Sequence, residues 1–176
     1  MDSDDSLILR CSTDPAAFRE LVRRYKAKLY GFLIHMAGHD AADDLFQELW
    51  LRVFKAAAHY EPRGQASSWL FKIARGVALN HLTRRGIWAR TQSEDSAQDF
   101  PDPSPTPHTV LEHSDLKVRM RAALAALPRE QREVFLLRES GGMSFKEIAA
   151  ELDIPLGTAL SRMNYALIKL KVSLRE

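Results

Sequence analysis

The sequence predicts an all-α fold made of two small helical domains that are joined by an acidic, proline-rich linker. Apolar residues recur at helical spacing in both halves of the 176-residue chain, and no strand-like alternation stands out. Four of the eight prolines alternate with other residues between positions 101 and 107, which removes backbone donors and keeps each preceding residue out of the helical region. We therefore expect one domain over residues 1–90, a linker over 91–112 and a second domain over 113–176.

The first domain is expected to contain three helices. Asp14 before a proline predicts an N-cap, and the helix that follows extends to the glycine at position 38. The second helix begins at Asp40. The third starts at Ser67 or Ser68 and reaches about residue 85, where a glycine stops it.

The second domain is expected to contain four helices, at about 115–127, 130–140, 144–152 and 156–174. A proline at position 128 ends the first, and a pair of glycines at 141–142 ends the second. Ser144 and Glu147 have the spacing of a capping box, which opens the third. The last two helices are separated by the short turn 153–155, so together they predict a helix-turn-helix.

Composition and motif content exclude several classes of protein. With 45% hydrophobic and 27% charged residues the chain is typical of globular proteins, and no apolar run approaches the roughly 18 residues that cross a bilayer. The acidic N-terminus does not resemble an export signal, and the single Cys11 excludes an intrachain disulfide or a paired-cysteine metal site. We expect a cytoplasmic protein without membrane insertion.

Signatures of enzymes, nucleotide-binding loops and metalloproteases are missing from the sequence, so no catalytic residue and no cofactor are expected. His35, His39 and Asp43 have the spacing of metal ligands on a helix, but Gly38 interrupts their shared face. We expect no metal site there. Cys11 has no neighbouring basic cluster and is interpreted as inert.

The charges divide the chain into three parts. Residues 1–90 carry 14 basic and 10 acidic side chains, and residues 116–176 carry 11 and 7. Between them, residues 91–115 carry six acidic side chains and no basic one. Two mildly basic domains separated by an acidic strip are compatible with a polyanionic partner, although many solvated helical surfaces have a similar excess.

Three surfaces are candidates for binding. The polar face of the second helix carries a leucine among charged and amide side chains, which is either a docking ridge for a protein or an ordinary solvated face: Asp44, Gln47, Glu48, Leu51 and Arg52. The third helix and the polar loop before it offer rings, cations and an amide that suit exposed bases and phosphates: Tyr60, Arg63, Trp69, Lys72, Asn80 and Arg84. Trp69 could equally be a core residue, and the loop only a connector.

The last helix is the candidate recognition helix. Ala159, Met163, Ala166 and Leu170 are expected to face inward. Thr158, Ser161, Arg162 and Asn164, on the outward and flanking positions, have donors and acceptors for base edges, and Tyr165 also faces outward. A helical hairpin that binds only protein remains an alternative for this motif.

The whole chain resembles the bacterial sigma factors of the extracytoplasmic-function (ECF, group IV) family. Segments 40–52 and 68–75 are similar to conserved elements of sigma region 2, and segments 124–135, 142–149 and 154–162 are similar to region 4. The resemblance implies a transcription initiation factor that is not an enzyme. Its implied partners are core RNA polymerase (the β′ clamp helices and the β flap), promoter DNA and an anti-sigma factor.

The resemblance also assigns roles to the three surfaces. It implies that the residues between Asp44 and Arg52 dock on the β′ clamp helices, that the group from Tyr60 to Arg84 recognises and melts the −10 element, and that the group from Thr158 to Tyr165 reads the −35 duplex. The acidic linker would run toward the RNA exit path of the polymerase.

Five departures from the family pattern bear on promoter choice. Leu160, Tyr165 and Leu167 stand where basic residues are common, and Gly76 stands where asparagine is frequent. Ala66 stands near a position that is often a bulky aromatic. We expect weaker or unusual −35 contacts, with Asn80 as the base-contacting amide. A stand-alone helix-turn-helix regulator and a helical adaptor that binds only protein are the alternatives to an initiation factor.

Overall fold

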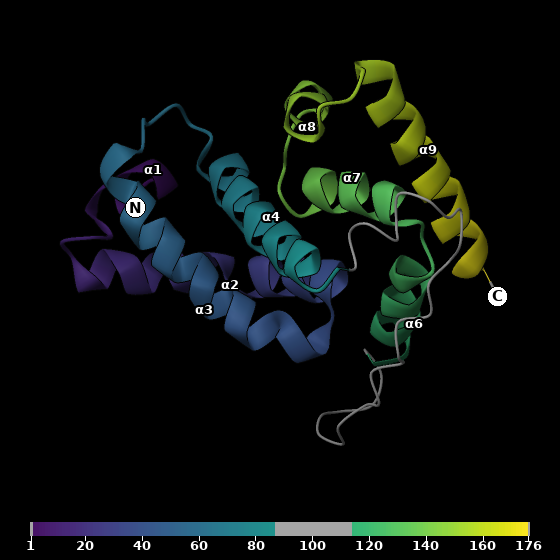
Figure 1. The fold of residues 1–176 in the computed structure, drawn as a ribbon, viewed down its shortest axis with the longest axis horizontal. Coiled ribbons are helices and arrows are strands. Elements are labelled where there is room, and N and C mark those ends of the chain that lie inside the picture. The colour runs from purple at the N-terminus through teal and green to yellow at the C-terminus, as the bar shows by residue number, and fades with distance from the viewer. Residues whose placement is uncertain (1, 87–113, 176) are drawn as a thin grey trace.

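The computed structural model describes residues 2–86 and 114–175, and within these ranges the chain forms helices and no strands. The N-terminal part contains α1 (Asp4–Arg10), α2 (Pro15–Ala37), α3 (His39–Ala56), the short 3-10 helix η1 (Ala57–His59) and α4 (Ala66–Arg84). The C-terminal part contains α6 (Ser114–Ala125), α7 (Arg129–Glu139), α8 (Phe145–Leu152) and α9 (Leu156–Ser173). Figure 1 shows the two groups side by side. The all-α prediction is confirmed.

Helix α2 begins and ends at the signals that predicted it, whereas α3 begins at His39, one residue before the predicted start, and α4 begins at Ala66, before the two serines that were expected to start it. The Asp14 side chain accepts a hydrogen bond from the Ala16 backbone N–H at 2.8 Å, and Pro15 occupies the first helical position of α2. Gly38, with φ of +91°, ends α2 and allows α3 to start at the next residue. Leu29, Leu49 and Leu70 come from three different helices and are fully buried together, so α2, α3 and α4 share one core.

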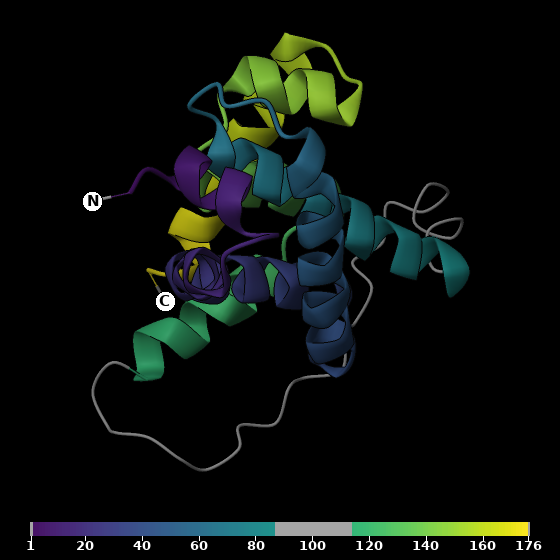
Figure 2. The same cartoon turned by 90° about the vertical axis from the view of Figure 1, so that its left-hand side faces the viewer.

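Helix α1 lies in a segment for which the sequence analysis predicted no helix. The Ser3 hydroxyl caps it by accepting from the Ser6 N–H at 3.2 Å, and Asp4 and Asp5 lie in its first turn, where negative charge is favourable. Leu7 and Ile8 are buried against the rest of the domain. This helix therefore belongs to the N-terminal domain core (Figure 2).

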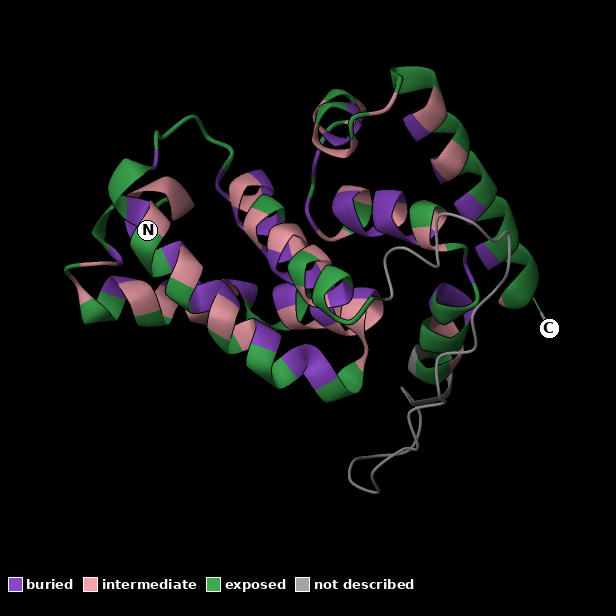
Figure 3. Ribbon diagram, in the orientation of Figure 1, coloured by how far each residue is buried: buried purple, intermediate pink, exposed green. Residues whose placement is uncertain are grey.

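The helix-turn-helix of the C-terminal domain has the predicted form. Ser144 and Glu147 make both hydrogen bonds of the capping box at the start of α8. Asp153, at φ 53° in the left-handed region, ends α8. The chain then turns and enters α9 after Pro155. The four residues expected to face inward on α9 are all buried, which fixes the outward face of that helix (Figure 3).

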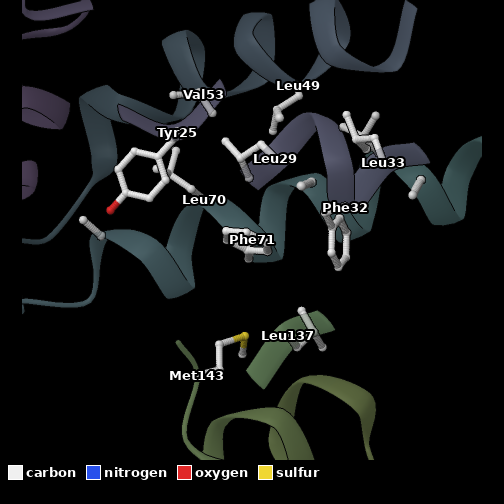
Figure 4. Close-up of a cluster of buried hydrophobic side chains, with 14 of the residues drawn as sticks. Tyr25, Leu29, Phe32, Leu33, Leu49, Val53, Leu70, Phe71, Leu137 and Met143 are labelled. Atoms are coloured by element: carbon white, nitrogen blue, oxygen red, sulfur yellow. The ribbon is translucent and has the colours of Figure 1, made fainter. Parts of the chain in front are cut away.

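The two domains pack against each other and share one hydrophobic cluster. Phe32 of α2 and Phe71 of α4 meet edge to face, with ring centroids 5.3 Å apart. Leu137 of α7 and Met143 of the following turn complete this cluster from the C-terminal domain, and all four are fully buried (Figure 4). The sequence predicted two domains but not this packing.

The predicted linker, residues 91–112, lies outside the described ranges. Within those ranges, no helix combines the length and the apolar character that a membrane span requires. Cys11 is buried at 2% exposure, and burial raises the pKa of its thiol, in keeping with the interpretation of an inert side chain.

Candidate polymerase and nucleic-acid interfaces

The candidate docking residues lie on one exposed strip of α3. We call this strip, made of Asp44, Gln47, Glu48, Leu51 and Arg52, the α3 ridge. Asp44 and Gln47 are exposed, and Leu51 is 63% exposed, the largest exposed fraction among the large apolar side chains of the described residues. Glu48 forms an ion pair with Arg52 one turn away, which holds both side chains along the helix. The ridge is thus a pre-ordered charged surface around one uncovered leucine.

Arg52 also borders a second feature, a hollow of about 590 Å³ between α3 and α4. The lining contains three cations and an indole but no acidic side chain: Arg52, Lys55, Ala56, Trp69, Lys72, Ile73 and Gly76. Trp69 is half-buried: it packs against the hydrophobic core and also lines this hollow. A basic hollow with an aromatic wall has the chemistry that binds a base and its phosphate.

Asn80 and Arg84 continue the line from the hollow along α4. Lys72, Gly76, Asn80 and Arg84 follow one another at four-residue intervals, so they share one side of the helix. Lys72, Asn80 and Arg84 are exposed. A Cβ added at Gly76 would meet no atom within 4 Å, so the glycine leaves free space where a side chain is common in the family.

The loop before α4 is more ordered than its polar sequence predicts. Tyr60 is buried at 8% exposure, its hydroxyl donates to the Asp5 carboxylate at 2.5 Å, and its ring lies 4.8 Å from the ring of Trp69. Burial and the carboxylate both raise the pKa of this phenol. Arg63 is exposed and forms an ion pair with Glu61. Tyr60 therefore packs against Trp69 and is covered, whereas Arg63 in the same loop is open to solvent.

The candidate −35 residues lie on the open side of α9. Asn164 and Tyr165 are exposed, the latter at 56%, and Thr158 is partly exposed near the start of the helix. The Ser161 hydroxyl is exposed and donates to the Thr158 carbonyl oxygen at 3.0 Å. Leu160 and Leu167, which replace the family's basic residues, are 46% and 48% exposed. The helix therefore offers few cations for phosphate.

Arg162 is paired within the protein. Its guanidinium lies 2.6 Å from the carboxylate of Glu130 at the start of α7. The arginine side chain is 23% exposed and the glutamate 68%. To reach a base edge, Arg162 must break its ion pair with Glu130 at least in part. Glu130 therefore competes with DNA for the main cation of the recognition helix.

A polar cluster that no sequence pattern predicted lies at the junction of the two domains. Arg75 of α4 lies 2.7 Å from Glu133 of α7 and 3.3 Å from Glu151 of α8. Ser67 donates to the Gly141 carbonyl oxygen at 2.8 Å. Arg132 of α7, buried at 7% exposure, donates to the His35 carbonyl oxygen at 3.0 Å. No local sequence pattern predicts these pairs, because the partners are between 58 and 97 residues apart in the chain.

The weak histidine pattern near position 38 does not form a cluster. Asp43 accepts a hydrogen bond from the Tyr30 hydroxyl at 2.8 Å, and His35 lies at the domain junction, where burial and Arg132 lower its pKa to about 4. Among the described residues, no group of three or more histidine, cysteine or acidic side chains is arranged to hold a metal ion.

Comparison with known proteins places these surfaces in a family. Residues 21–87 match Sigma-70 region 2, and residues 117–170 match Sigma-70 region 4. The chain is 30% identical over 168 residues to the ECF RNA polymerase sigma factor RpoE of Cereibacter sphaeroides, a match that covers 93% of this chain and 89% of that protein. The chain belongs to the ECF sigma factors. Its α3 ridge and hollow lie in region 2, and its helix-turn-helix lies in region 4.

Two further matches extend the comparison. This ECF sigma factor is 35% identical over 150 residues to the ECF RNA polymerase sigma factor SigE of Mycolicibacterium smegmatis, covering 82% of this chain but 56% of that protein. Among solved structures, it is similar to the sigma factor RpoE of Bartonella quintana, determined in complex with the anti-sigma factor NepR. That match has a TM-score of 0.70 and 26% identity, and it covers 90% of this chain and 96% of the other.

Proposed function

We propose that this protein is an alternative sigma factor that binds core RNA polymerase, directs it to a specific set of promoters and helps to melt their −10 region. It acts in the cytoplasm as an initiation factor and not as an enzyme. The family matches support this function over that of a stand-alone helix-turn-helix regulator, because they cover region 2 as well as region 4.

The observation that carries the proposal is the α3 ridge. A leucine exposed inside a strip of charged side chains suits a contact with another protein, in which its apolar surface is removed from water. Leu51 at 63% exposure, flanked by Asp44 and the Glu48–Arg52 pair, has the anatomy of an interface: an apolar centre with a charged rim. We assign this ridge to the β′ clamp helices of the polymerase.

DNA recognition is divided between the domains. The hollow and the line Lys72–Asn80–Arg84 support a role in holding the opened −10 strand, since cations and an aromatic wall bind single strands without needing base pairs. Base flipping costs a few kcal/mol, which stacking and pocket contacts offset. The open side of α9 supports major-groove reading of the −35 duplex.

The closed packing of the two domains must open for this function. The −10 and −35 elements lie on the order of 25 base pairs apart, and at about 3.4 Å per step this is a span of ~85 Å. A compact chain of this length has a radius of gyration near ~16 Å. Helices α4 and α9 therefore cannot reach both elements while Phe71 and Arg75 are packed against the C-terminal domain. We infer that the polymerase separates the domains.

An anti-sigma factor is the proposed regulator. The solved structure of the Bartonella quintana relative contains one. In this chain, the surfaces that are buried where the two domains pack together would have to become accessible before such a protein could bind between the domains.

The proposal is tested by adding the purified protein to core polymerase and a pool of genomic fragments in a run-off transcription assay. We expect discrete transcripts that depend on the added protein. Transcription should fail with core polymerase alone and with the Leu51→Asp variant. Duplex DNA binding by the isolated protein with no effect of polymerase would instead support the stand-alone regulator.

A further inference from the structure

One carboxylate of α1 holds both ends of the loop before α4. Asp5 accepts a hydrogen bond from the Tyr60 hydroxyl at 2.5 Å through one oxygen and from the Gly64 backbone N–H at 2.7 Å through the other. The two donors are separated by Glu61, Pro62 and Arg63, all of which are exposed. The three-residue tip of the loop is therefore held on both sides by a single side chain, which lies 55 to 59 residues away in the sequence.

Asp5 and the loop that it holds connect to the hollow through two aromatic rings. The Tyr60 ring lies 4.8 Å from that of Trp69, at an interplanar angle of 58°, and Trp69 lines the hollow. Gly64 has φ of +71°, a left-handed conformation that glycine adopts without steric cost, and its N–H is directed to the Asp5 carboxylate. Hydrogen bonds to an ionised carboxylate are worth roughly twice those between neutral groups. Asp5 thus fixes the loop tip and the aromatic wall at the same time.

We propose that Asp5 is a positioning residue for −10 recognition: it sets the geometry of the Tyr60–Gly64 loop and of Trp69, and so the choice of base in the opened strand. This inference rests on the proposed function. Asp5 does not touch DNA in this account, and it acts through Arg63 and Trp69, which do.

The neighbouring residue Asp4 provides a matched control. It lies in the same first turn of α1, but it accepts from the Tyr25 hydroxyl at 2.6 Å and pairs with Arg24 at 2.7 Å, both on α2. Removing Asp4 therefore loosens α1 from α2 without releasing the loop. Any effect that arises merely because α1 docks less firmly should appear in both variants.

The experiment compares Asp5→Ala, Asp5→Asn and Asp4→Ala in reconstituted holoenzyme. A template is first selected by the unmodified holoenzyme from a pool randomised in the −10 element. The measured quantity is the ratio of initiation on this template to initiation on templates with one −10 base changed. Asp5→Ala should lower this ratio about tenfold at one or more positions, because losing two charge-assisted hydrogen bonds releases the loop.

Asp5→Asn should restore the ratio to within about twofold, because its amide can accept from Gly64 and donate to the Tyr60 oxygen. Asp4→Ala should keep the ratio of the unmodified protein. Tyr60→Phe, which keeps the ring and removes one hydrogen bond, should lower the ratio about threefold. This variant tests the same inference if Asp5→Ala does not fold.

The inference is overturned if Asp5→Ala and Tyr60→Phe lower initiation equally on all templates, or if Asp4→Ala changes the ratio as much as Asp5→Ala. Absence of promoter-dependent initiation by the unmodified protein would overturn the proposed function itself, so the two failures are distinguishable.

Discussion

Arg75 of α4 and Glu133 of α7 form an ion pair 2.7 Å long between the two domains, with the arginine side chain 16% exposed and the glutamate 7%. Glu151 of α8 adds a second carboxylate to the same arginine at 3.3 Å. A pair this well covered is costly to break on one side only, because the remaining charge is left in the interface. The pair therefore opposes the separation of the domains that promoter binding requires.

Glu133→Gln should weaken this closure. We expect a loss of about 2 kcal/mol in the free energy of unfolding, below the usual range for a broken buried pair because Glu151 still contacts Arg75. Small-angle scattering should show a larger radius of gyration. Glu139→Gln, on an exposed position of the same helix, should change neither quantity. Equal behaviour of the two variants would show that the ion pair does not hold the domains together.

Gly141→Ala tests the apolar part of the same junction. A Cβ there would lie 2.6 Å from the Leu137 carbonyl oxygen and 3.1 Å from the Phe71 ring, so the backbone or the neighbouring domain must move. We expect ~1–3 kcal/mol of destabilisation, measured by urea unfolding. Gly31→Ala in α2, where a Cβ meets nothing within 4 Å, should instead be neutral or stabilising by up to about 1 kcal/mol. A silent Gly141→Ala would argue against close packing at this point.

The partly buried His35 makes the stability depend on pH. Burial, followed by the charge of Arg132, lowers its pKa to about 4 from 6.5, so the folded protein holds the imidazole neutral. This contribution is fully present above pH 6.5 and is lost as the pH falls from 6.5 to 4, since the unfolded chain takes up the proton first. The shift corresponds to about 3 kcal/mol. His35→Gln should remove this slope from unfolding curves measured between pH 7 and 5, whereas His39→Gln, at an exposed position, should keep it.

Leu51→Asp separates docking from folding. Because Leu51 is 63% exposed, the change should alter the free energy of unfolding by no more than about 0.5 kcal/mol. Binding to core polymerase should weaken at least about tenfold if the leucine is the centre of the interface. Leu9→Asp is the matched control, since Leu9 is also exposed, at 47%, but lies on α1 away from the ridge. Unchanged polymerase affinity for Leu51→Asp would remove the α3 ridge as the docking surface.

Glu130→Gln should release Arg162 for DNA. The glutamate is 68% exposed, so its loss costs the fold little, while the freed guanidinium gains access to the groove. We expect a several-fold increase in initiation from templates that depend on the −35 element, together with a steeper salt dependence. Arg162→Ala should have the opposite effect, and neither variant should affect premelted templates that lack the −35 element. A decrease in −35-dependent initiation with Glu130→Gln would mean that the pair positions Arg162 rather than competing with DNA.

Local sequence signals were sufficient for most helices but not for their assembly. The Asp14 cap, the Ser144–Glu147 capping box and the inward residues of α9 act within one helix, so their patterns predicted the structure directly. Helix α1 was missed because it has only seven residues, although Ser3, the two aspartates after it, and Leu7 with Ile8 carried a start signal and an apolar side.

Contacts between distant segments could not be predicted in this way. Phe71 is fully buried, yet no pattern in the sequence identified Leu137 and Met143 as the residues that pack against it from the other domain. The family resemblance assigned Tyr60 to the −10 contacts, and the burial of Tyr60 beside α1 depends on Asp5, from a helix that had not been predicted. The exposure of Leu51, in contrast, follows from helical spacing alone.

The account is tested most directly by one distance, between fluorophores attached through Thr83→Cys on α4 and Lys169→Cys on α9. Both positions are exposed, and the buried Cys11 should remain unlabelled. We expect a short distance with efficient energy transfer in the free protein, and a large loss of transfer when core polymerase and promoter DNA are added, as the domains move toward sites on the order of 80 Å apart. Efficient transfer that persists in an active polymerase–promoter complex would contradict the account.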